Sequence, residues 1–143
     1  MNKIELKKIV KIETSQIFER DFRIMPLWKI KIVCYLTRNN RYYRAEYLKS
    51  FRYFKYYENS KRLIQAFFWF RRYNHFSLLL NSCINSNSIG DGFFFVHSNI
   101  VINKKAVIGK NVCLLGDNCI RAGTFNAIAY ERPDPWKQCL GRL

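Results

Sequence analysis

The sequence predicts a protein that is mainly β in its C-terminal part, a parallel β-helix of hexapeptide repeats, preceded by an α-helical N-terminal region. A period of six fits neither a helix, with about 3.6 residues per turn, nor a two-sided strand. It is typical of a coil in which each short turn points one aliphatic residue inward. The pair Ile-Gly occurs at residues 89–90 and again at 108–109. The hydrophobic residue at every sixth position is Val96, Ile102, Ile108, Leu114 and Ile120.

Residues 1–83 form the first predicted domain, which is basic, aromatic and helical. Residues 1–25 alternate charged and aliphatic side chains, and we expect a helix there. Pro26 marks a break, and the segment PLWKIKIVCYL that it begins fits a strand or a helix. A helical period starts near Asn40, and the aromatic residues on one face of that helix are Tyr43, Tyr47, Phe51 and Phe54.

A second helix is expected after Glu58-Asn59-Ser60, which we interpret as a break with a capping residue. Leu63, Phe67 and Phe70 share one side of it. Aromatic residues at helical spacing usually belong to a core, and Lys and Arg usually belong to the solvated face. Residues 81–88 are predicted to be a polar connector. The second predicted domain is the hexapeptide repeat, residues 84–125.

Positive charge is concentrated in the first half of the chain. Residues 1–75 contain 18 Lys and Arg against 6 Asp and Glu, whereas residues 76–143 contain 7 against 4, for a net charge of +15. A basic surface with aromatic side chains fits an anionic membrane or a nucleic acid. No recognised nucleic-acid motif is present, so peripheral membrane contact is the favoured alternative of the two.

Five cysteines form no CxxC pair, and an odd count without tight spacing argues against a disulfide framework or a zinc site. We therefore expect reduced thiols and no metal. No segment resembles a signal peptide, and no apolar run approaches the ~20 residues of a membrane-spanning helix. The expected location is the cytoplasm, with membrane-peripheral contact as a variant.

The segment IGDGFFFVHSNIVINKKAVIGKNVCLLGDNCI resembles the serine acetyltransferase-like branch of the hexapeptide-repeat acyltransferases. The family pattern runs Ile-Gly-x-Gly-aliphatic, then His, then Ile-Val-Ile-Asn, then Ala-x-Ile-Gly-x-Asn. The resemblance covers about residues 84–124 and implies a left-handed β-helix. The matching residues are Ile89, Gly90, Gly92, Phe93, His97, Ile100, Val101, Ile102, Asn103, Ala106, Ile108, Gly109 and Asn111.

This resemblance implies an acetyl-CoA-dependent O-acetyltransferase that acts on serine or on a sugar hydroxyl, in cysteine or polysaccharide biosynthesis. Acetyl-CoA would be the cosubstrate, without a metal, and a full-length chain would form a homotrimer or a dimer of trimers. His97 would be the general base, since imidazole has a pKa near working pH. Ala122, Gly123 and Thr124 are the candidate cofactor-binding residues, in a small turn that parallels one lining the family's coenzyme A groove.

The chain departs from the family pattern around His97. The turn that holds this histidine is shorter than in the family, and the Asp residues that often orient the histidine are missing. We interpret Asp91 and Asp117, the nearest acids in sequence, as turn residues, and the acid partner of His97 stays open. The other histidine, His75, lies outside the repeat and is interpreted as structural.

The six-residue stride ends after Thr124. The last residues, AYERPDPWKQCLGRL, contain two prolines and scattered charges. Shifting the codons by one base from Arg132 onward permits the product A-P-T-L-G-N-N-V-W-V-G, which continues the hexads. The hypothesis is that residues 126–143 are an irregular, frameshifted tail of a truncated acetyltransferase. Two alternatives remain: a non-catalytic remnant of such an enzyme, and a peripheral membrane-binding protein that uses its basic helices.

Overall fold

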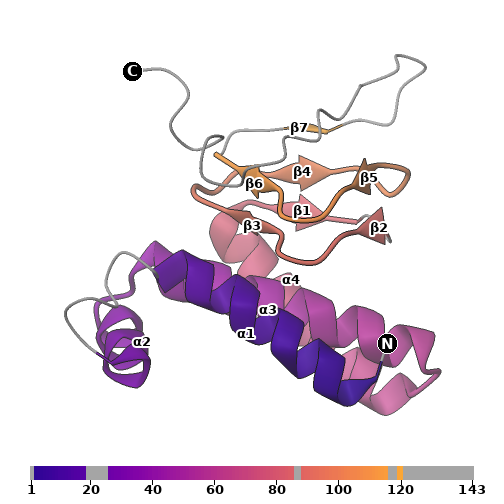
Figure 1. The fold of residues 1–143 in the computed structure, drawn as a ribbon, viewed down its shortest axis with the longest axis horizontal. Helices are drawn as coiled ribbons and strands as arrows, with labels where there is room; N and C mark the ends of the chain where they lie inside the picture. The colour runs from indigo at the N-terminus through magenta and orange to yellow at the C-terminus, as the bar shows by residue number, and fades with distance from the viewer. Residues whose placement is uncertain (1, 19–25, 86–87, 116–118, 121–143) are drawn as a thin grey trace. The chain divides into compact units, whose positions relative to one another are not determined.

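The fold is described by a computed structural model of the chain (Figure 1), which covers residues 2–18, 26–85, 88–115 and 119–120. The chain divides into two compact units, the first spanning Met1–Asn81 and the second beginning at Ser82. The predicted domains, residues 1–83, 84–125 and 126–143, stay a prediction. The tail that we interpreted as frameshifted lies outside the described residues.

Four helices build the first unit: α1 (Lys3–Phe18), α2 (Leu27–Leu36), α3 (Asn40–Asn59) and α4 (Leu63–Leu80). Helices α3 and α4 form a hairpin, and α1 packs along α3 (Figure 1). The segment after Pro26, which fitted a strand or a helix, is helix α2. Helix α3 begins where the Asn39 side chain accepts a hydrogen bond from the Arg41 N–H. It continues through Glu58 and Asn59 to a C-cap at Ser60, so the break falls later than predicted, and Arg62 is the N-cap of α4.

The core of this unit lies between α1, α3 and α4. The rings of Tyr47 and Tyr73 stack with centroids 5.0 Å apart, and the Tyr47 hydroxyl donates to the Tyr73 hydroxyl at 3.2 Å. On the predicted aromatic face of α3, Tyr47 and Phe51 are buried, while Tyr43 and Phe54 are half-buried. The periodicity therefore located both the helix and its inward side.

Helix α4 differs from the expectation. Leu63, Phe67 and Phe70 are exposed. The inward positions of α4 are instead those that face α3, and they are Ala66, Tyr73, Phe76 and Leu80. An apolar residue on nearly every side of this helix made its core face ambiguous in the sequence.

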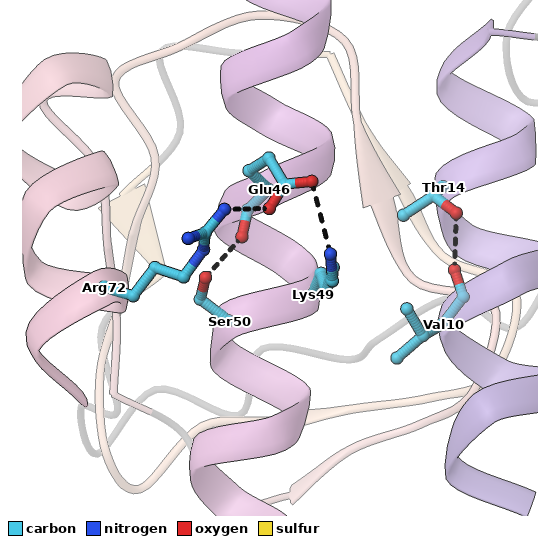
Figure 2. Close-up of polar contacts among 6 residues, drawn as sticks. All are labelled: Val10, Thr14, Glu46, Lys49, Ser50 and Arg72. Atoms are coloured by element: carbon cyan, nitrogen blue, oxygen red, sulfur yellow. Dashed lines mark hydrogen bonds and ion pairs between the residues drawn. The ribbon is translucent and has the colours of Figure 1, made fainter. Parts of the chain in front are cut away.

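Ion pairs connect the three packed helices. Glu13 of α1, which is buried, accepts two hydrogen bonds from the Arg52 guanidinium of α3, at 2.6 and 3.1 Å. Figure 2 shows the second pair, in which Arg72 of α4 lies 2.7 Å from Glu46 of α3. Lys49 approaches the same carboxylate at 3.5 Å. The Glu13–Arg52 and Glu46–Arg72 pairs connect α3 to α1 and to α4.

Hydroxyl side chains in α1 and α3 bond to their own helix. The Ser50 hydroxyl donates to the Glu46 carbonyl oxygen at 2.6 Å, and the Thr14 hydroxyl donates to the Val10 carbonyl oxygen at 2.7 Å (Figure 2). Both donors are buried. The bonds to the preceding turn satisfy polar groups that would otherwise be buried without a partner.

Short parallel strands make up the described part of the second unit, and each is two residues long. They are β1 (Cys83–Ile84), β2 (Ser88–Ile89), β3 (Phe94–Phe95), β4 (Val101–Ile102), β5 (Val107–Ile108), β6 (Cys113–Leu114) and β7 (Cys119–Ile120). They pair in the orders β1-β4-β7, β2-β5 and β3-β6. Strand β1 falls inside the segment predicted to be a polar connector, which is a correction to that expectation.

Paired residues in these ladders share a face. Ile84 pairs with Ile102, and Ile102 pairs in turn with Ile120; Ile89 pairs with Ile108. From β4 onward the second residue of each strand belongs to the six-residue stride. Ile102 and Ile108 are buried and Leu114 is half-buried, whereas the first residues of β4 and β5, Val101 and Val107, are exposed.

The stride fails at its first position. Val96 follows β3 and is only half-buried, whereas Phe95 is fully buried and pairs with Leu114. The reason is the length of the next connection, since five residues separate β3 from β4 but four separate β4 from β5. One extra residue moves the inward position from 96 to 95.

The predicted fold class is wrong. The sequence predicted an α-helical N-terminal region followed by a mainly β C-terminal part with a left-handed parallel β-helix. Helices account for 60% of the described residues and precede the strands. The strands are short pieces in three separate sheets, and no left-handed β-helix is evident in the described part of the chain. The physical reason is that the stride covers only residues 96–120, and pairing of two-residue parallel strands satisfies it without a continuous β-helix.

Candidate functional site

The candidate catalytic histidine lies in the second unit, on the connection between β3 and β4. His97 is exposed. The Val96 N–H donates to the Leu114 carbonyl oxygen at 2.9 Å on one side of it, and the Ile100 N–H donates to the Ser82 hydroxyl at 3.1 Å on the other. Both ends of the connection are therefore fixed to neighbouring segments, and the imidazole faces solvent between them.

Backbone conformation also shapes this connection. Asn99 has φ 62°, in the left-handed region that side chains other than Gly rarely adopt and that Asn tolerates. The Asn residue of the His-Ser-Asn sequence thus turns the chain back toward β4. Ser82 was not singled out from the sequence, and its place in a polar segment gave no signal that its hydroxyl would hold Ile100.

The glycines of the quoted pattern lie at close approaches between ladder partners. A Cβ built on Gly90 would lie 2.6 Å from the carbonyl carbon and oxygen of Gly109, so only Gly fits there. Gly92 has φ 76°, and a Cβ there would collide with the Asn111 side-chain oxygen. Packing explains these glycines. His97 is the residue of the pattern whose side chain can act as a base.

Acid partners for His97 are not found among the described residues. The structure records neither a hydrogen bond nor an ion pair for its side chain in those parts of the chain. Asp91 is an exposed turn residue, as expected, and its carbonyl oxygen accepts from the Asn111 N–H at 2.8 Å. Asp117 lies outside the described residues, so the partner stays open.

Some of the other candidate residues lie in the described part of the chain and others lie outside it. Ala122, Gly123 and Thr124, the candidate cofactor-binding residues, lie outside the described part of the chain. His75 is exposed on α4, and its ring lies edge-on to Phe76 with centroids 5.2 Å apart. Across the described ranges, no group of three or more His, Cys, Asp or Glu side chains could hold a metal ion. The cysteines that the structure describes form no disulfide, and they are Cys34, Cys83, Cys113 and Cys119.

Comparison of the chain with models of known protein families, with curated proteins and with solved structures gave no match. No helix among the described residues is long and apolar enough to cross a membrane.

Proposed function

We propose that this protein is an acetyl-CoA-dependent O-acetyltransferase in which His97 is the general base. The observation that supports the proposal is an exposed imidazole on a connection anchored at both ends, in a segment whose sequence resembles that of serine and polysaccharide O-acetyltransferases. A fixed, accessible base is what transfer to a hydroxyl requires, because the acceptor proton must leave as the oxygen attacks.

The reaction assigned to His97 is one proton transfer coupled to acyl transfer. The imidazole takes the proton of a serine or sugar hydroxyl, and the oxygen attacks the thioester carbonyl carbon of acetyl-CoA. The carbon–sulfur bond then breaks, and the thiolate of coenzyme A receives the proton from the imidazolium. The products are an acetyl ester and free coenzyme A, without change of oxidation state.

The test is thiol release by the full chain, with serine and with sugar acceptors in separate assays. His97→Ala should lower the rate by about two to four orders of magnitude, the usual range for loss of a general base, while coenzyme A still binds. Coenzyme A binding is measured separately by calorimetry, because a base acts on the reaction and not on cofactor affinity.

The matched control is His75→Ala, which removes another exposed imidazole, from helix α4 of the first unit. This variant should keep the wild-type rate. Absence of transfer by the wild-type chain to every acceptor would contradict the proposal and favour the non-catalytic remnant. An unchanged rate in His97→Ala would remove that residue from the mechanism.

A further inference from the structure

The first two turns of α4 present an exposed apolar surface. Its residues are Leu63, Ile64, Phe67 and Phe68, here called the α4 patch, and their exposed fractions are 79%, 85%, 68% and 59%. At spacings of one, four and five residues they lie on one side of the helix. Large side chains this exposed on neighbouring positions mark a surface that contacts another apolar body.

The α4 patch is separate from the face that builds the core. Ala66, Tyr73, Phe76 and Leu80 are the buried residues of α4, on the side that packs against α3. Helix α4 therefore has two apolar faces, and among the described residues only one of them is buried. The second face is not required to hold α3 and α4 together.

Basic residues flank the α4 patch along the chain. Lys61 and Arg62 precede it and Arg71 follows it by one turn, all three exposed. Within the described residues none of the three forms an ion pair. Helix α4 contains no acidic residue, and the nearest one before it, Glu58, is already paired with Lys55 at 2.9 Å.

We propose that the α4 patch docks on an anionic phospholipid bilayer. The patch would enter the boundary between headgroups and acyl chains, with the helix axis parallel to the surface, while the flanking cations meet lipid phosphates. Charge complementarity supports this occupant, since the first 75 residues contain 18 Lys and Arg against 6 Asp and Glu. An anionic bilayer attracts each nearby cation, so each of the three flanking cations should strengthen binding several-fold.

Two other occupants fit the patch less well. A second copy of the chain would bring its own Lys61, Arg62 and Arg71 against the same cations, and like charges repel. Nucleic acid would satisfy the cations but offers little to Leu63 and Ile64, since bases stack on aromatic rings and not on branched aliphatic chains. A bilayer satisfies both the charge and the aliphatic surface. This inference does not depend on the proposed acetyltransferase activity.

The test is co-sedimentation of the full chain with vesicles of phosphatidylcholine and phosphatidylglycerol, in a three-to-one mixture, and with phosphatidylcholine alone. Wild-type protein should bind the mixed vesicles at low salt and bind the neutral vesicles much more weakly. The double variant Ile64→Ser with Phe67→Ser should bind the mixed vesicles about tenfold more weakly or worse, from the lost apolar burial. Both side chains are exposed, so the helices should keep their circular dichroism.

The matched control is Ile32→Ser on α2, the helix that adjoins the other end of α3. Ile32 is also half exposed, at 50%, and its loss should leave vesicle binding at the wild-type level. A second variant, Lys61→Gln with Arg62→Gln and Arg71→Gln, should lose more than tenfold in binding to the mixed vesicles at low salt. This variant separates the electrostatic part from the apolar part.

Four results would overturn the proposal: equal binding to both vesicle types, unchanged binding of the Ile64/Phe67 variant, an equal loss in Ile32→Ser, or no vesicle binding at all. Two parallel measurements identify another occupant in that last case. Self-association that disappears in the Ile64/Phe67 variant would assign the patch to a second copy. Binding to single-stranded RNA that disappears in the same variant would assign it to nucleic acid.

Discussion

At the scale of single residues, we expect the buried ion pair of Glu13 and Arg52 to contribute strongly to the stability of the helical unit. The Glu13 side chain is 1% exposed and that of Arg52 is 11% exposed, and the guanidinium contacts both carboxylate oxygens. A buried carboxylate is tolerated only while its partners are in place. The pair joins α1 to α3, so breaking it should weaken the packing of these two helices.

Arg52→Met should destabilise the helical unit by about 3–5 kcal/mol, because Glu13 would be left as a buried charge without its main partner. Urea unfolding followed by far-UV circular dichroism measures this. Adding Glu13→Leu to Arg52→Met should recover much of the loss, since the charge is removed as well. A double variant no more stable than Arg52→Met would contradict this account.

The control for this pair is Lys55→Met, which breaks the ion pair with Glu58. That carboxylate is 48% exposed, so water replaces the lost partner and the expected cost is below about 1 kcal/mol. A cost for Lys55→Met equal to that of Arg52→Met would show that burial does not set the value of these pairs.

At the level of elements, the parallel ladders depend on which residue of each two-residue strand faces inward. In β5, Ile108 is buried and its neighbour Val107 is 71% exposed. The Gly90 N–H donates to the Ile108 carbonyl oxygen at 2.9 Å, which ties β5 to the end of β2. Side-chain burial and backbone pairing are therefore coupled at one residue.

Ile108→Asp should open the β2–β5 ladder, because a carboxylate without partners is costly enough in an apolar interior to unfold a small unit. Hydrogen exchange at the Gly90 amide measures the opening directly, and its protection should fall sharply. Val107→Asp, one residue away on the exposed face, should keep near wild-type protection. Equal protection in both variants would show that the assigned inward face is mistaken.

Considered as a whole, the molecule has a large excess of positive charge. The net charge is +15, and most of it lies in the first half of the sequence. Charges of one sign repel one another in the compact state and lower its stability. Exposed charges interact across a Debye length of about 30 Å at 0.01 M salt but only about 10 Å at 0.1 M. Added salt should therefore weaken the repulsion.

The melting temperature should therefore rise by a few degrees between about 10 and 200 mM sodium chloride, as measured by circular dichroism. Replacing exposed Lys8 and Lys11 by Gln should raise the melting temperature at low salt and flatten its salt dependence. A melting temperature that falls with salt would mean that surface ion pairs outweigh the repulsion.

The sequence determined much of the local structure by itself. The spacing of Tyr47 and Phe51 located α3 and its buried side, because a helix places such residues on one face. The six-residue stride located β4 to β7, since the second residue of each belongs to it. For the candidate site, the sequence supplied His97 as the candidate base, and the close backbone approaches at Gly90 and Gly92 became visible only in the structure.

Tertiary structure decided the rest. The fold class predicted from the stride was wrong, because a six-residue spacing places aliphatic residues on paired strands but does not require those strands to wind into a β-helix. Helix α4 is apolar on nearly every side, so only its packing against α3 selected Tyr73 and Phe76 for the core and left Ile64 and Phe67 in solvent. The extra residue between β3 and β4 moved the inward position from Val96 to Phe95, since pairing with β6 depends on partners far away in sequence.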